Sequence, residues 1–202
     1  MIFLSVADVY CIDNSPPINQ FVDTASFIKF RSLDFMTNNL GDDIDLVLLF
    51  EPPKVGKLYV DVFPVCWRVL SFSAIGIGLA TVEYTGDSGF VVPEVESSGS
   101  RIVASNAQHC EIGQKCTLKT NANGNLNYLT SAIDSASPNV MQCLNGTERP
   151  ARIGAGYFNR SGTKIEPVFL WDGIAKGSML SINPSTMLKI YAVSGYQGTI
   201  EI

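Results

Sequence analysis

Turn-forming residues recur along the chain at intervals of about eight to twelve residues. Glycine, proline, asparagine and serine gather in short clusters, among them residues 14–17, 39–41, 86–89, 123–124, 145–146, 161–162, 172–173 and 183–184. The runs between them are rich in β-branched and aromatic side chains, at residues 26–33, 45–50, 57–63, 66–72, 79–84, 164–171 and 187–193. This spacing is typical of sandwiches and barrels. The sequence therefore predicts an all-β fold, an antiparallel β-sandwich.

Alternation within these runs agrees with strands. In residues 57–63, the side chains of Leu58, Val60 and Val62 are expected to face the core, and the residues between them to face water. A short helix is the one competing expectation. Leu126, Leu129 and Ile133 recur at helical spacing, which predicts a helix within residues 127–136.

The tail of the chain has the clearest strand pattern. Turns separate expected strands at residues 152–158, 164–171, 177–182, 187–193 and 196–202, which predicts a C-terminal meander. The apolar start, residues 1–8, is expected to be a first strand. No linker or shift in composition divides the chain, so residues 1–202 are expected to form a single domain.

Charge narrows the choice of partners. Apolar residues make up 46% of the chain and charged residues 16%, with a formal net charge of -5. A chain this acidic is not expected to make the phosphate contacts that nucleic-acid binding needs, so no nucleic-acid partner is predicted. A strand-rich chain with few charges leaves open sheet edges, and pairing of such edges predicts a homo-oligomer.

Catalytic chemistry is restricted by the single histidine, His109. A Ser-His-Asp or Cys-His site would have to use it, and no Gly-x-Ser-x-Gly elbow is present. A zinc site needs about four ligands, whereas His109, Cys110 and Cys116 supply only a Cys-x5-Cys spacing. We expect no enzyme and no metal, with Cys110 and Cys116 as a cross-strand pair, reduced or oxidised. His109 is expected at a turn or rim.

Targeting signals are not apparent. The apolar start has no basic residues before it, and Asp8 interrupts it, unlike a secretory signal. The uncharged stretch from Val69 to Val82 is shorter than the roughly 20 residues of a membrane-spanning helix. The number of cysteines, 5, is odd, which favours free thiols in a reducing compartment. We therefore predict a cytoplasmic protein, with the sequons at Asn145 and Asn159 bare.

Aromatic side chains offer the best candidate site. Trp67, Trp171 and Tyr157 lie in expected strands, and aromatic residues in a sandwich most often belong to the core. The alternative is a pocket whose flat walls hold a small aromatic ligand, with a few polar groups setting its orientation. Trp67, Trp171, Tyr157 and His109 are the predicted ligand-binding residues. Aromatics at strand ends could instead stack on sugar rings, and the stretch from Ser71 to Thr81 could form a membrane-inserting hairpin.

Two segments resemble a known family. The residues Phe63-Pro-Val-Cys-Trp-Arg-Val-Leu70 are similar to a Trp-Lys-Val-Ile segment of small, mostly uncharacterised basidiomycete proteins. The tail resembles theirs as well, at Arg152, Tyr157, Gly162, residues 173–177, Pro184 and Ile190. The segment from Tyr84 to Gly89 matches their Ser/Tyr/Gly-rich segment only in part.

The resemblance implies a cytosolic fungal β-protein. Small mushroom proteins without leaders include lectins, membrane-acting toxins and pigment-binding chromoproteins. The leading hypothesis is therefore a non-enzymatic protein that binds a small planar ligand, with a small organic chromophore as the one cofactor considered. The alternatives are a carbohydrate-binding lectin and a membrane-acting or structural self-assembling protein.

Overall fold

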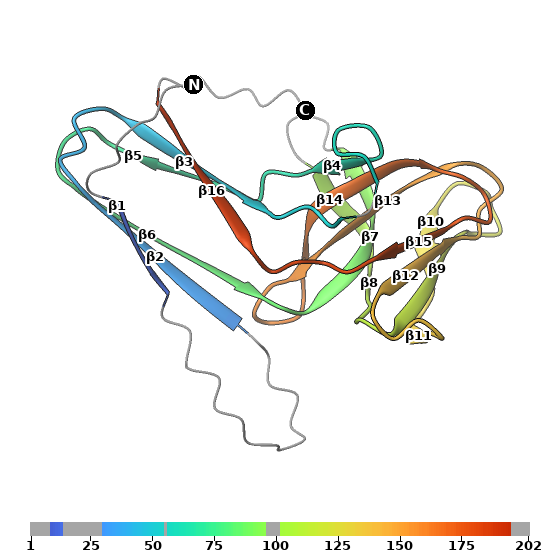
Figure 1. The fold of residues 1–202 in the computed structure, drawn as a ribbon. Helices are drawn as coiled ribbons and strands as arrows, with labels where there is room; N and C mark the ends of the chain where they lie inside the picture. The colour runs from blue at the N-terminus through green and yellow to red at the C-terminus, as the bar shows by residue number, and fades with distance from the viewer. Residues whose placement is uncertain (1–8, 14–29, 55, 96–101, 195–202) are drawn as a thin grey trace, which may run out of the picture.

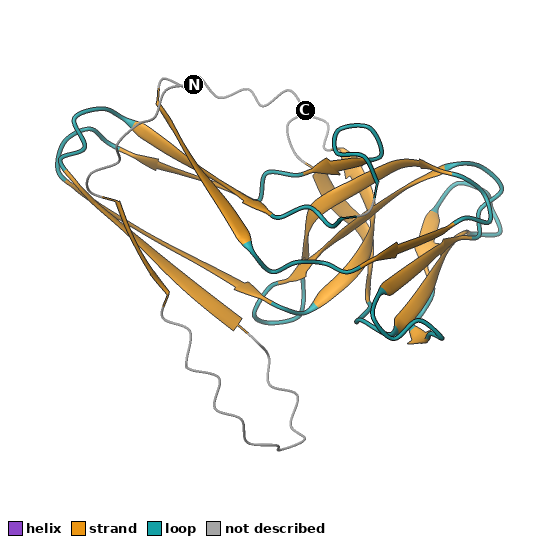
Figure 2. Cartoon of the chain, viewed as in Figure 1, coloured by secondary structure: helices purple, strands orange, loops and turns teal. Residues whose placement is uncertain are grey.

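The computed structural model describes residues 9–13, 30–54, 56–95 and 102–194. Every regular element in this part of the chain is a strand, as Figure 2 shows. The predicted all-β, sandwich-like fold is confirmed. The strands expected at residues 1–8 and 196–202 lie outside the described residues.

Four sheets contain the strands. The first, in the order β1-β2-β6, consists of β1 (Val9–Asp13), β2 (Phe30–Asn38) and β6 (Ile77–Thr85). The second, β16-β3-β5, consists of β3 (Ile44–Phe50), β5 (Arg68–Phe72) and β16 (Leu188–Ser194). The third, β4-β14-β13-β7-β8, consists of β4 (Val62–Pro64), β7 (Ser88–Val95), β8 (Ile102–His109), β13 (Ala151–Phe158) and β14 (Ile165–Ile174). The fourth, β10-β9-β12-β15 with β11 beside β9, consists of β9 (Gln114–Thr120), β10 (Asn127–Leu129), β11 (Ile133–Asp134), β12 (Met141–Asn145) and β15 (Met179–Ile182).

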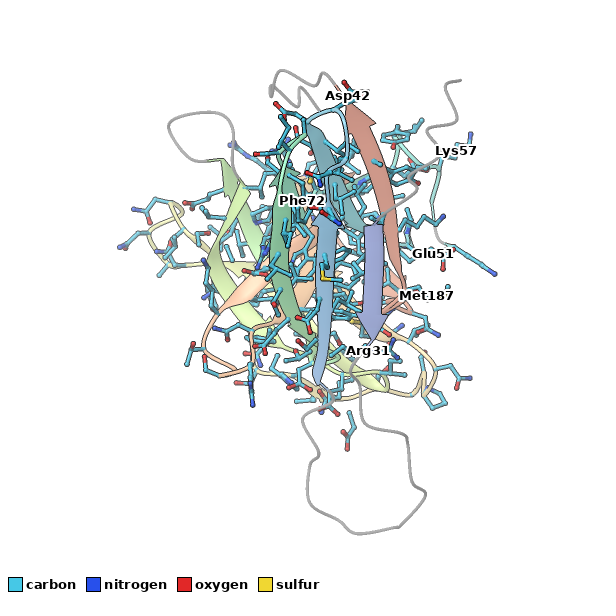
Figure 3. The ribbon with its side chains drawn as sticks, turned by 90° about the vertical axis from the view of Figure 1, so that its left-hand side faces the viewer. Arg31, Asp42, Glu51, Lys57, Phe72 and Met187 are labelled. Atoms are coloured by element: carbon cyan, nitrogen blue, oxygen red, sulfur yellow. The ribbon has the colours of Figure 1, made fainter. Side chains whose placement is uncertain are left out.

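The two three-stranded sheets pack face to face (Figure 1). Strict alternation in β3 points Ile44, Leu46, Leu48 and Phe50 into the space between them. Their contact is close, because a Cβ added to Gly78 of β6 would lie 2.6 Å from Phe72 of β5. In the side view of Figure 3, Asp42 and Phe72 lie toward one end of the strands, and Arg31 and Met187 toward the other.

The third sheet is curled. Its strand β14 is hydrogen-bonded to β4 and β13, and it also contacts β8 at the far edge of the same sheet. Register shifts interrupt β13–β14 pairing between Ala155 and Gly156 and β7–β8 pairing between Val92 and Pro93. Such bulges increase the local twist of a sheet. Gly156 is needed at its bulge, because a Cβ there would lie 2.0 Å from the backbone oxygen of Glu166.

The tail forms strands, but they do not lie side by side as a meander. Only β13 and β14 pair with each other. The next strand, β15, pairs with β12, and β16 pairs with β3 in another sheet. The meander expectation is therefore wrong beyond its first hairpin, because each later strand completes a different sheet edge.

Two local predictions are also wrong. Residues 57–61 form a turn in which the Lys57 carbonyl accepts hydrogen bonds from the backbone of Val60, Asp61 and Val62, and the Asp61 carboxylate accepts from the Lys57 backbone at 2.8 Å. These local bonds replace strand pairing and leave Leu58 and Val60 exposed. Residues 127–136 contain β10 and β11, which pair with β9, instead of a helix.

Asn145 is fully buried at the end of β12. Its side-chain amide donates to the backbone oxygens of Arg149 at 3.0 Å and Ile174 at 2.7 Å. Its carbonyl oxygen accepts from the backbone and hydroxyl of Thr147. This sequon asparagine therefore has no exposed nitrogen in the folded protein.

Candidate functional site

An aromatic cluster lies where the first three sheets meet, with Tyr84 from β6, Phe50 from β3 and Tyr157 from β13. The ring of Phe50 is 5.2 Å from Trp67, 5.4 Å from Tyr84 and 4.6 Å from Tyr157, measured between centroids. The two tyrosine hydroxyls donate to the backbone oxygens of residues 185 and 186, at 2.7 and 3.3 Å. Edge-to-face rings with satisfied hydroxyls form a rigid support. This cluster holds one side of the Trp67 indole.

The chain around Trp67 bridges the two sheets. The backbone nitrogen of Val65 donates to Val168 of β14 at 2.9 Å. Two residues later, the backbone nitrogen of Trp67 donates to Leu48 of β3 at 3.0 Å. Because both ends of this short segment are tied to strands, the indole has little freedom to move.

Arg68 and Glu166 enclose the other side of the indole. The Arg68 guanidinium carbon lies 4.6 Å from the Trp67 ring centroid. One guanidinium nitrogen, Nη2, donates to both carboxylate oxygens of Glu166, at 2.8 and 2.7 Å. The indole Nε1 donates to the same carboxylate at 2.7 Å. A plane of positive charge thus lies over the ring, held there by a carboxylate from β14.

The charge state of Glu166 follows from these contacts. Burial alone would raise the pKa of the Glu166 carboxyl. The hydrogen bonds from Arg68 and Trp67, together with the positive charges of Arg68 and Lys164, outweigh burial and lower the pKa below its ordinary value. Glu166 is therefore a carboxylate at neutral pH.

A pocket of about 320 Å³ opens beside this group. Three segments line it: residues 65–68, the part of β8 at residues 102–104 and 107, and residues 163–167. The β8 side chains and Pro167 are apolar, and the polar groups are gathered on Arg68, Lys164 and Glu166. The pocket exists because the curled sheet brings β14 close to β8 without hydrogen-bonding the two strands.

The four predicted site residues do not converge on this pocket. Trp67 lines it, and Tyr157 lies behind Trp67, in contact with the same Phe50 ring. Trp171 lines a second pocket of about 330 Å³, and its buried indole nitrogen has no hydrogen-bond partner among the described residues. The His109 ring is 5.4 Å from the Phe158 ring, and its Nε2 is 3.9 Å from a Glu111 oxygen.

Sequence reasoning missed Arg68, Glu166 and Lys164. Arg68 and Glu166 are far apart in the chain and meet only through the pairing of the sheets. The one available signal was that Arg68 follows Trp67 directly.

A group of buried thiols lies in and beside the fourth sheet. Cys116 and Cys143 are partners in the parallel pairing of β9 with β12, and Cys110 reaches the Cys116 thiol from the preceding turn. All three are buried and free. The hydrogen bond with Cys116 and burial raise the pKa of Cys110. At Cys116 the hydrogen bond with Cys110 lowers the pKa, but the hydrogen bond with Cys143 and burial together outweigh it and raise the pKa above its ordinary value. The predicted pair is thus part of a trio, and Cys110 does not lie across a hairpin from Cys116.

Among the described residues, no group of three or more His, Cys, Asp or Glu side chains is arranged to hold a metal ion. Within these ranges, no helix is long and apolar enough to cross a membrane.

Comparison with known proteins gives no match, whether to a family model, to a curated protein or to a solved structure. The resemblance to basidiomycete proteins therefore stays a prediction.

Proposed function

We propose that the chain is a non-enzymatic binding protein that holds a small planar ligand in the pocket beside Trp67. The observation that carries this proposal is the held Trp67–Arg68–Glu166 group at the edge of a pocket of about 320 Å³. Ligand pockets are commonly about 300–1,000 Å³, mostly apolar, with a few polar groups that fix orientation. This pocket lies at the lower end of that size range, and its lining is divided about evenly between apolar side chains and the polar groups of Arg68, Lys164 and Glu166.

The geometry also modifies how a ligand would be held. The Trp67 ring is covered by Arg68 on one side and by aromatic rings on the other, so a ligand cannot stack on the indole directly. A guanidinium plane itself stacks on aromatic rings. We expect the ligand ring to lie against the β8 wall and the Arg68 plane, with Trp67 fixing that plane.

The proposal also includes the cellular compartment and the oligomeric state. Four of the 5 cysteines have side chains that the structure describes, and these four are free thiols, three of them buried, which supports a reducing, cytoplasmic compartment. Homo-oligomer formation is supported by β6, a nine-residue edge strand without Lys or Pro that pairs, among the described strands, with β2 alone.

A second candidate is a membrane-acting or self-assembling protein. The hairpin expected over Ser71–Thr81 does not form, because β5 and β6 belong to different sheets. The turn between these strands and the start of β6 nevertheless present Ile75, Ile77 and Leu79, which are 85%, 74% and 75% exposed. Exposed apolar patches mark interaction surfaces. Dye release from liposomes tests this candidate, and Ile75→Ser should abolish release if it is right.

The test of the leading proposal begins with the absorption spectrum of natively purified protein and mass spectrometry of what denaturation releases. A planar probe is then titrated into Ala107→Phe, which fills the pocket from an exposed position of β8. The matched control is Ala136→Phe, at an exposed alanine outside the pocket. We expect loss of binding only in Ala107→Phe. Equal binding by both variants would refute the pocket, and binding on a glycan array instead would favour a lectin.

A further inference from the structure

The hydrogen-bonding capacity of the pocket is unevenly used. Both oxygens of Glu166 already accept hydrogen bonds from Arg68 or Trp67. The Thr163 hydroxyl is engaged with Ser161 and Asn159, at 2.7 and 3.3 Å. The side-chain acceptors that line the pocket are therefore largely occupied.

The donors are not. A guanidinium has five N–H groups. Arg68 uses Nη1 for the Trp67 backbone oxygen at 2.8 Å and Nη2 for Glu166, which leaves Nε and a second Nη1 hydrogen without a partner among the described residues. The Lys164 ammonium makes no ion pair or hydrogen bond with any side chain in the described ranges. Spare N–H donors thus outnumber spare acceptors.

The charges lead to the same conclusion. Glu166 neutralises Arg68, since the two form an ion pair at 2.7 Å. The positive charge of Lys164 also acts on this carboxylate, so two cations face one anion and the three groups keep one net positive charge at the pocket. The chain as a whole carries a formal net charge of -5, so a positive pocket stands out against its surroundings.

Resting on the proposed function, we propose that the ligand is an aromatic carboxylate. Its ring lies against the apolar wall formed by Val103, Ala104 and Pro167. Its carboxylate accepts hydrogen bonds from the Lys164 ammonium and the spare N–H groups of Arg68. An amine or an uncharged ring would offer these donors no charged acceptor, and an amine would also be repelled by Lys164.

Two probes of equal size separate charge from shape: 2-naphthoate and the neutral 2-naphthamide. Titration of the full chain, followed by tryptophan fluorescence or calorimetry, should give about tenfold tighter binding of the naphthoate, the size of one charge-assisted contact. Raising the salt concentration should reduce this preference, because Lys164 is exposed.

The decisive variant is Lys164→Met, which keeps the aliphatic stem and removes the charge. It should bring naphthoate down to the affinity of naphthamide and leave naphthamide unchanged. Lys119→Met, at an exposed lysine of β9 outside the pocket, is the matched control and should change neither.

Failure of this inference can be told apart from failure of the proposed function. Equal wild-type affinity for the two probes, with both blocked by Ala107→Phe, overturns the carboxylate and keeps the pocket. The same holds if Lys164→Met weakens both probes equally. If neither probe binds, or if Ala107→Phe leaves binding intact, both proposals fall.

Discussion

Replacing Glu166 by glutamine should destabilise the fold by about 1–2 kcal/mol at neutral pH. The carboxylate accepts one hydrogen bond from Trp67 and two from Arg68. A glutamine oxygen in the place of Oε2 can keep the two bonds that this atom accepts, but it carries no charge, and the NH₂ group in the place of Oε1 faces the Arg68 Nη2 donor. Shielded hydrogen bonds to charged groups contribute about 1.5–3 kcal/mol each, and exposed ion pairs about 0.2–1 kcal/mol. The side chain of Arg68 is 38% exposed and that of Glu166 is 24% exposed, so we expect the energy of their interaction to lie between these limits.

Thermal unfolding followed by circular dichroism measures the effect. For a chain of about this size, 1 kcal/mol corresponds to a Tm change of about 2–4 °C, so we expect a decrease of about 2–8 °C. Glu148→Gln is the control, because its partner Lys176 is exposed and the Glu148 side chain is 85% exposed. That variant should change Tm by little more than the error of the measurement.

The pH dependence gives the stricter test. The pKa of Glu166 is lowered in the folded state, so its contribution is complete above the pKa of the unfolded chain, about 4.3, and is lost as the pH falls through the lower folded value. The difference between wild type and Glu166→Gln should therefore be full at pH 7 and shrink below about pH 4. An unchanged Tm at pH 7, or a difference that persists in acid, would refute the assigned role of the carboxylate.

Three further predictions concern other parts of the fold. Gly156→Ala should cost about 2–4 kcal/mol in chemical denaturation, because its Cβ would collide with the Glu166 backbone; wild-type stability would show that the bulge relaxes freely. Cys110, Cys116 and Cys143 should not react with a thiol reagent at pH 8 until the chain unfolds, because all three are buried and because the raised pKa values of Cys110 and Cys116 leave little thiolate there. Rapid labelling of Cys110 or Cys116 in the native protein would contradict this prediction. Leu79→Lys should lower the mass measured by light scattering toward the 21.9 kDa of one chain, and an unchanged oligomer would show that β6 is not its interface.

The alternation of apolar and polar residues predicted strands correctly where one face of the strand is fully buried. β3 alternates over its whole length because the opposing sheet covers one face, and its expected bounds differ from the observed ones by a single residue. Residues 57–63 show the same alternation in sequence, yet a side-chain cap from Asp61 makes a turn more stable than pairing. The alternation of apolar residues in the sequence does not indicate whether local hydrogen bonds or hydrogen bonds between strands will be the more stable.

The candidate site was predictable only at Trp67. Its neighbours there depend on which strands meet, and the sequence contains no record that β14 brings Glu166 to Arg68. For the same reason the two tryptophans, alike in their apolar surroundings, belong to different pockets. Strand order across four sheets is a non-local property, and it decides which polar groups meet.

The buried amide of Asn145 has a consequence for producing the protein. Oligosaccharide transfer acts on an exposed asparagine nitrogen, but the folded chain uses both hydrogens of that nitrogen to join β12 to the backbone at residues 149 and 174. A glycan attached during synthesis would remove one of these hydrogens and place a bulky group inside the core. In a secretory host, glycosylation of Asn145 would therefore compete with folding. Removing the sequon by Asn145→Gln would not solve the problem, because the longer glutamine side chain does not fit the hydrogen bonds that asparagine makes at this position. A cytosolic host avoids the conflict.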